Sequence, residues 1–202
     1  MPEVYVQAGR QEMTTIALLS IAMDKEERNN VLNAISTHLA STFDASIIVI
    51  GDAPSPLQNS RTIFDEERNQ SNSEEVLRWL AMTLRNKNNT KSPHPAKMTI
   101  ILGICNFDAY SSGLNFVFGQ ASPTEGVAAI FLPRLRQQFY GLSADRLIFT
   151  ERVLKEATHE LGHAFGLTHC SNQFCVMHFS NSLADTDRKA KDFCNICRNK
   201  LY

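Results

Sequence analysis

Residues 159–170 read HELGHAFGLTHC, and this stretch restricts the fold more than any other part of the chain. His159 and His163 are four residues apart, so on a helix they lie on one face, where both imidazoles can reach one metal ion. Gly166 permits a left-handed turn that ends the helix and reverses the chain, which brings His169 towards the same ion. The stretch therefore predicts a helix, a reversal and a zinc site with three histidine ligands.

Glu160 is predicted to be catalytic and not a ligand. It is rotated about 100° around the helix from His159, so it cannot join the two histidines as a ligand. It can instead contact a water that the metal binds in its fourth position. Zinc lowers the pKa of such a water to about 7 and polarises a bound carbonyl. A carboxylate beside that water can take its proton and pass the proton to a leaving amine. The alternative is a chance match of H-E-x-x-H on a charged helix.

Four of the five cysteines form two close pairs near the C-terminal end, and the fifth, Cys105, ends an apolar run. The spacing C-x₄-C followed by C-x₂-C is typical of a structural zinc with no open position. The predicted ligands are Cys170, Cys175, Cys194 and Cys197. Because Cys170 directly follows His169, this zinc would help to position a ligand of the other one. Two disulfides, or Cys170 as a ligand of the catalytic metal, are the alternatives.

The rest of the pattern predicts an α/β or α+β fold, with helices packed against a sheet. Strands are expected at 13–23, 46–52, 97–105, 114–121 and 127–133. The continuous apolar run at 46–52 indicates a central strand covered on both faces, and 114–121 indicates an edge or bent strand. Helices are expected at 24–42, capped by Asp24, and at 73–87.

A long helix is expected to begin at a Ser143 cap, with an apolar stripe from Leu147 to Phe165. The segments 53–60 and 86–95 are interpreted as loops, and His38 and His94 as structural histidines. After Gly166 the chain changes to short loops and a charged terminal helix within 185–201.

The C-terminal part has too little apolar content to hold itself together, so zinc should stabilise it. We predict a single domain over 1–202 with two subdomains. An upper subdomain, 1–166, would carry the sheet and the active-site helix. A lower subdomain, 167–202, would carry the four-cysteine zinc site.

Composition excludes several classes of function. The net charge is −1 and the pI about 6.6, which gives no electrostatic footprint for nucleic acid or an anionic membrane. No apolar run approaches the roughly 20 residues that a spanning helix needs. The apolar stretch 14–23 could pass for part of a signal peptide, but acidic residues precede it and no cleavage site follows. We interpret it as a buried strand and expect a cytoplasmic protein.

The stretch HELGHAFGLTH resembles the signature of the metzincin metallopeptidases, which also requires a downstream methionine turn. Met177, in CVMHF, lies where that turn is expected. The cysteines narrow the resemblance to the archaemetzincin family, whose pattern places four cysteines around the methionine. The segment from Met177 to Cys194 is about one residue shorter than that pattern. The resemblance is firm over 151–197 and weaker over 114–141.

The resemblance implies a metzincin-like fold, with a mixed twisted sheet, two helices and an active-site helix. It implies that Met177 forms an apolar floor beneath the zinc ligands and that 114–121 lines a substrate cleft. It also implies a peptidase, with an aminopeptidase-like activity as one form.

The predicted function is zinc-dependent hydrolysis of peptide bonds by a zinc-bound water, with Glu160 as the general base. The alternatives are a non-catalytic, zinc-stabilised peptide-binding protein and a zinc hydrolase of another amide. We expect two zinc ions per chain, a peptide or protein substrate, and a monomer that binds neither nucleic acid nor membrane. The same ligands would also hold cobalt or nickel.

Overall fold

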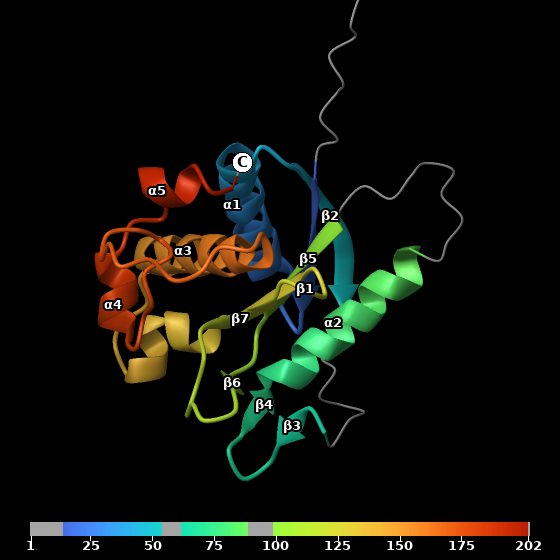
Figure 1. Cartoon of the computed structure of the whole chain (residues 1–202). Coiled ribbons are helices and arrows are strands. Elements are labelled where there is room, and N and C mark those ends of the chain that lie inside the picture. Colours follow the sequence, from blue (N-terminus) through green and yellow to red (C-terminus); the bar gives the residue numbers. More distant parts are fainter. Residues whose placement is uncertain (1–13, 54–61, 89–98, 202) are drawn as a thin grey trace, which may run out of the picture.

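The computed structural model describes residues 14–53, 62–88 and 99–201 (Figure 1). Residue 13, His94 and most of both predicted loops lie outside the described residues. The main sheet has the strand order β2-β1-β5-β8-β7. Its strands are β1 (Thr15–Ile21), β2 (Ser46–Ala53), β5 (Thr99–Cys105), β8 (Val127–Phe131) and β7 (Gly119–Ser122). The first four strands are parallel, and β7 runs antiparallel to β8 at one edge.

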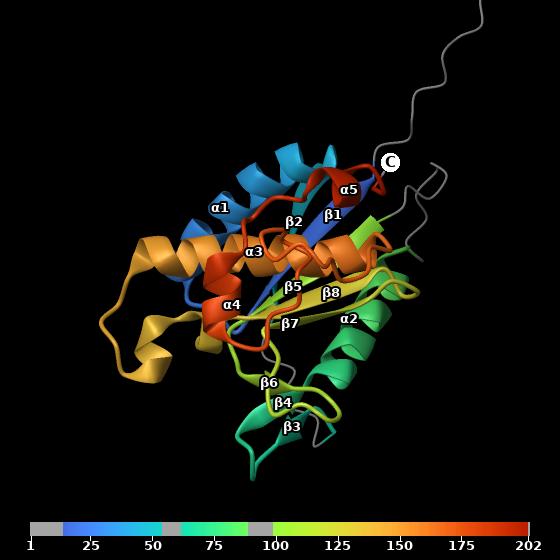
Figure 2. The same cartoon turned by 60° about the vertical axis from the view of Figure 1, so that its left-hand side comes forward.

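Helices cover both faces of this sheet (Figure 2). On β1, Ile16 and Leu18 face one apolar cluster with α1 (Lys25–Phe43) and α3 (Arg146–Ala164). The alternate residues Ala17 and Leu19 face a second cluster with α2 (Ser73–Asn88). Successive side chains of a strand point to opposite faces, so a run of apolar residues can fill two cores at once. The predicted α/β architecture is confirmed.

A second, small sheet contains β3 (Phe64–Asp65), β4 (Gln70–Asn72) and β6 (Ala109–Tyr110). Two 3-10 helices, η2 (Pro133–Leu135) and η3 (Gln137–Tyr140), follow β8 and lead to α3. The chain then ends with α4 (Leu183–Arg188) and α5 (Asn195–Arg198). Among the described residues, none of the helices combines the length and apolarity that crossing a membrane requires.

The position predicted for 46–52 is wrong. This segment forms β2, which lies at the edge of the sheet, with Ile48 45% and Val49 54% exposed. The chain passes from β1 through α1 to β2 and then crosses to the other side of β1, so β5 is the central strand instead. An apolar run identifies a strand but does not state its place in the sheet order.

The helix starts are partly as predicted. Asp24 caps α1 and accepts hydrogen bonds from the backbone N–H groups of Glu26 and Glu27. The predicted Ser143 cap of α3 is wrong, because Asp145 holds that position and accepts from two backbone N–H groups. Leu147 lies in the first turn of α3 and is 80% exposed, so it is not part of the buried stripe.

Two more boundaries differ from expectation. Regular structure in the predicted edge strand begins only at Gly119, and the residues before it form irregular backbone that contributes to the cavity described below. The predicted terminal helix is divided into α4 and α5. A capping box between Ser182 and Asp185 starts α4 earlier than expected.

The C-terminal segment packs into the core formed by α1 and α3. Cys175, Val176, Met177, Phe193 and Cys197 belong to the same apolar cluster as those helices. A double hydrogen bond reinforces the packing: Arg152 of α3 donates through Nε and Nη2 to Asp187, both at 2.7 Å. The active-site helix is therefore held between the sheet and this segment.

Candidate active site

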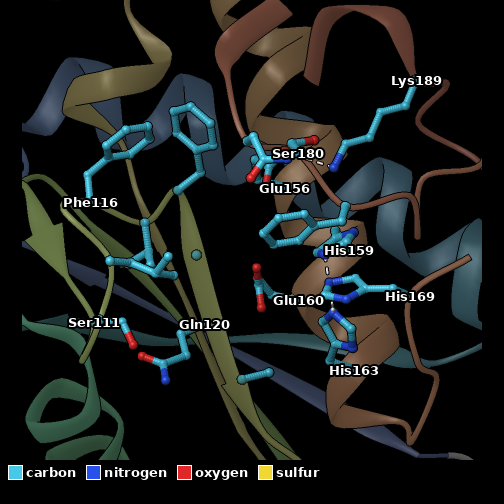
Figure 3. Close-up of a pocket in the computed structure, with 18 of the residues that line it drawn as sticks. Ser111, Phe116, Gln120, Glu156, His159, Glu160, His163, His169, Ser180 and Lys189 are labelled. Carbon is cyan, nitrogen blue, oxygen red and sulfur yellow. Dashed lines mark hydrogen bonds and ion pairs between the residues drawn. The ribbon is translucent and has the colours of Figure 1, made fainter. Parts of the chain in front are cut away.

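The three predicted histidines converge. His159 and His163 project from the last turns of α3, and the chain reverses at Gly166, whose φ is +92°. The reversal brings the His169 side chain next to those of His159 and His163 (Figure 3). The Nε2 atom of His163 lies 3.1 Å from that of His159 and 3.3 Å from that of His169. Nitrogens this close, all facing one point, suit a single metal ion at the usual distance of about 2 Å.

The outer nitrogen of two rings is fixed by the backbone. The Nδ1 atom of His159 lies 2.7 Å from the carbonyl oxygen of Val176, and that of His163 lies 2.7 Å from the carbonyl oxygen of Leu167. A carbonyl only accepts hydrogen bonds, so Nδ1 carries the proton in both rings and Nε2 presents its lone pair.

Burial also favours the neutral, metal-binding form of these rings. It lowers the pKa of His159 well below its ordinary value, and it lowers the pKa values of His163 and His169 as well. Burial is the main cause in all three cases, because it disfavours the charged form. Neutral imidazole is the form that binds a divalent metal.

Glu160 is buried beside the edge strand. A Cβ atom built on Gly119 would lie 2.5 Å from Cγ and 2.7 Å from Oε1 of Glu160. Only glycine leaves room for this approach. Burial raises the pKa of Glu160 well above its ordinary value; the Glu156 carboxylate adds to this shift, and the Lys189 ammonium opposes it.

A cavity of about 580 Å³ joins these groups. Its walls are strand β7, the irregular segment 113–118, the exposed side of the histidines and the segment 179–181. Figure 3 shows Glu160 between the edge strand and the histidines, so that a molecule in the cavity would meet both.

The four clustered cysteines also converge. Their Sγ atoms all lie within 4.8 Å of one another, with those of Cys170 and Cys194 3.9 Å apart. All five cysteines are free thiols in the described part of the chain. A backbone N–H hydrogen bond from Cys197 is the main cause that lowers the pKa of Cys194 to about 7. Cys105 is buried in β5, apart from this cluster.

Met177 is fully buried and packs against α3 at Gly162. A Cβ atom built on Gly162 would collide with the Met177 Sδ atom and approach Phe193 to 3.1 Å. Gly162 therefore allows the methionine to pack directly against the helix.

Three features of the site were not predicted from the sequence. These are the close approach of Gly119 to Glu160, the packing of Met177 on Gly162, and a buried ion pair of Glu156 and Lys189 at 3.1 Å. Glycine inside a helix is unfavourable by about 1 kcal/mol relative to alanine, so Gly162 was a usable signal of close packing. Nothing local distinguishes Lys189 within its charged run.

Comparisons with known proteins agree with this geometry. The family model described as Peptidase family M54 matches residues 13–202. The archaemetzincin of Pyrococcus furiosus is 41% identical over 179 residues, which is 87% of this chain and 88% of the relative. That of Sulfolobus acidocaldarius is 37% identical over 174 residues, 86% of this chain and 89% of the relative.

Solved structures are similar too. A zinc-dependent peptidase from Methanocorpusculum labreanum matches with a TM-score of 0.80 and 32% identity, over 93% of this chain and all of that one. The archaemetzincin of Archaeoglobus fulgidus, determined in complex with malonate, matches with a TM-score of 0.70 and 32% identity. That match covers 93% of this chain and 99% of the other.

Two histidines on such a helix and a third after the chain reversal, beside an antiparallel edge strand, define the protein as a zinc metallopeptidase of the metzincin type. The chain belongs to peptidase family M54, the archaemetzincins. The predicted family and enzyme class are both confirmed.

Proposed function

We propose that this zinc peptidase cleaves peptide bonds with His159, His163 and His169 as ligands of the catalytic zinc and Glu160 as the general base. The observation that carries the proposal is the convergence of three Nε2 atoms next to a buried carboxylate. When bound there, zinc would acidify a water and polarise the substrate carbonyl.

Glu160 supplies the proton transfer in this proposal. Its carboxylate accepts the proton of the attacking water and then donates it to the leaving amine. The low-polarity surroundings favour a carboxylate that can exist in both forms during the reaction. Gly119 holds the edge strand against this side chain, so the substrate backbone would pass within reach of it.

Strand β7 has a free edge to which an extended substrate could bind. The N–H of Phe131 donates to the carbonyl of Phe118. Along an antiparallel ladder, pairs of residues that exchange hydrogen bonds alternate with pairs that do not. Gln120 therefore bonds towards β8, while the backbone groups of Gly119 and Ala121 point away from the sheet. A peptide could add to them as a further strand.

The second part of the proposal concerns the C-terminal segment. Cys170, Cys175, Cys194 and Cys197 would hold a structural zinc, giving two zinc ions per chain and defining a lower subdomain over 167–202. The backbone N–H of Cys170 donates to the Met177 carbonyl at 2.9 Å, so the cysteine cage and the methionine turn are directly linked. We also propose a cytoplasmic monomer.

Two other functions compete with this one. A non-catalytic, peptide-binding protein would have no need for a buried carboxylate next to the metal. A zinc hydrolase of another amide would use the same residues on a different substrate. Aminopeptidase-like cleavage is one form of the proposed peptidase activity, and it would require recognition of a free amino group.

Metal analysis and one substitution test the proposal. The purified protein should contain two zinc ions per chain, and Glu160→Gln should retain both while losing turnover of a peptide library followed by mass spectrometry. Because general-base catalysis contributes about 10²–10⁴-fold, the loss should be at least of that order. Equal cleavage by Glu160→Gln would remove Glu160 from the mechanism.

A further inference from the structure

Unpartnered polar atoms gather in the active-site cavity. Among the described residues, five buried side-chain nitrogen or oxygen atoms have no hydrogen-bond partner, and three of them belong to residues that line this cavity. These three are Oε1 of Gln120, Oγ of Ser180 and Nζ of Lys189. Buried polar atoms are nearly always hydrogen-bonded, so exceptions that line one cavity indicate that a ligand or water completes the bonding there.

Of these three atoms, Nζ of Lys189 carries a charge, and its side chain is almost completely buried. Its side chain is only 1% exposed, and Nζ lies 3.1 Å from Oε1 of Glu156, within ion-pair distance but without hydrogen-bond geometry. An ammonium has three N–H donors, and burying a charge is costly unless it is both paired and hydrogen-bonded. Lys189 therefore keeps donor capacity that the protein does not use.

At this end of the cavity, the polar groups that lack hydrogen-bond partners are donors. The Glu156 oxygen already accepts from Thr186 Oγ1 at 3.1 Å and faces Lys189. The charge of Glu156 is thus largely compensated, whereas Lys189 and the hydroxyl of Ser180 can still donate. A group that only accepts hydrogen bonds fits such a site, and a carboxylate also adds charge attraction to the ammonium.

The position of these residues places the site next to the reacting centre. Glu156 precedes His159 by one helical turn, so both lie on the same face of α3. Figure 3 shows Glu156, Ser180 and Lys189 together at one end of the cavity beside His159, with Gln120 at the other end. A substrate side chain directly adjoining the cleaved bond would reach them.

A purely structural role for Lys189 is the competing interpretation. The ion pair joins the segment after α4 to α3, and it would stabilise that contact. However, Arg152 already binds Asp187 through two hydrogen bonds, and Lys155 donates to the carbonyls of Thr186 and Asp187. These contacts anchor α4 without opening an unused donor into the cavity.

We propose that Ser180 and Lys189, the latter held by its ion pair with Glu156, form a subsite that binds a carboxylate of the substrate next to the cleaved bond. The carboxylate is either an Asp or Glu side chain or the C-terminal carboxylate of a short peptide. This inference rests on the proposed peptidase function, and it names the substrate class for the same site.

A peptide library tests the preference. The zinc-loaded parent, Lys189→Met and Lys191→Met would be compared on matched peptides with Glu or Gln at each position. Lys191 is the matched control, because it also joins the C-terminal segment to α3, through Glu151 at 2.8 Å, but does not line the cavity. One set of peptides has amidated C-termini and the other has free carboxylates, which separates the two sources of the carboxylate.

The expected result is a ratio of kcat/KM values. The parent and Lys191→Met should prefer the carboxylate-bearing peptide over its amide by about 10- to 100-fold, the range for a hydrogen bond to a charged group. Lys189→Met should reduce this ratio to one or below, because the Glu156 carboxylate then lacks its cation, while the amide peptides are still cleaved at a measurable rate. If Lys189→Met cleaves with the parent's preference, or the parent has none, the subsite proposal is overturned and the peptidase proposal stands.

Two further measurements keep the test independent of turnover and of folding. In the zinc-loaded Glu160→Gln protein, calorimetry should give glutarate at least about tenfold tighter binding than its monoamide, and Lys189→Met should remove the difference. This binding comparison tests the subsite even if no peptide is cleaved. An absence of cleavage would count against the peptidase function alone. Should Lys189→Met fail to fold, Ser180→Ala preserves the ion pair and must still lower the glutarate preference; an unchanged preference refutes the subsite.

Discussion

Gly119 and Glu160 lie so close together that a Cβ atom at position 119 would be 2.5 Å from Cγ of Glu160. These residues come from the edge strand and the active-site helix, which are 41 positions apart in the sequence. The absence of a side chain on one residue thus determines where the carboxylate of the other can lie.

Replacing Gly119 by alanine should therefore displace Glu160. We expect kcat to fall about 100-fold, the cost of a misplacement near 1 Å, while the zinc content remains unchanged. Ser122→Ala on the same strand is the control, since its hydroxyl hydrogen-bonds with Thr124 and Ser122 does not line the active-site cavity. In the Gly119→Ala background, Glu160→Asp should cost less than it does in the parent, because the shorter side chain relieves the contact; equal costs would argue against direct contact.

Gly162→Ala should disturb the methionine floor. The added methyl group collides with Met177, and this overpacking should lower the free energy of unfolding by up to about 2 kcal/mol, after the gain in helix propensity. Chemical denaturation measures the loss. Combined with Met177→Ala, the glycine substitution should cost less than it does alone, since the colliding atoms are gone. Simple additivity of the two changes would contradict the packing described above.

Removing one cysteine of the C-terminal cluster should cost a metal ion and much of the stability. Cys194→Ser should leave about one zinc per chain and lower the melting temperature sharply, because structural zinc contributes about 10–16 kcal/mol of apparent binding energy. Cys105→Ser is the matched control: it removes a buried thiol outside the cluster and should retain both ions. Two ions in Cys194→Ser would mean that the cluster is not a zinc site.

His38 should make the stability depend on pH. Its Nε2 lies 3.0 Å from Oγ1 of Thr158, and burial lowers its pKa below 6.5, with Asp192 and Glu151 opposing this shift and Lys191 adding to it. Between that lowered pKa and 6.5 the unfolded chain binds more protons than the folded one, so stability decreases as the pH falls through this range.

The substitution His38→Gln retains a donor for Thr158 but does not titrate. Thermal unfolding of the zinc-loaded proteins from about pH 7.5 to about pH 5 should show a smaller loss of stability in His38→Gln than in the parent. His159, His163 and His169 are present in both proteins, so their titration cancels in the difference. Parallel pH profiles would show that His38 is not the cause.

Local spacing made the two clusters of candidate metal ligands predictable. His159 and His163 follow from helical geometry, and Gly166 indicated the reversal that brings in His169. Contacts between distant segments were not predictable in the same way. The sequence around Gly119 does not indicate its contact with Glu160, and the sequence around Lys189 does not indicate its ion pair with Glu156. The edge position of β2 was missed for a related reason, since apolar residues occur in central and edge strands alike.

The carbonyls of Val176 and Leu167, which fix the rings of His159 and His163, belong to the main chain, and every amino acid supplies such a group. The orientation of these two rings therefore depends on the path of the backbone and not on the side chains at positions 167 and 176. Substitutions at these two buried positions should be tolerated when the new side chain fills the same volume. The proposed metal site can therefore persist while the residues that orient its histidines change.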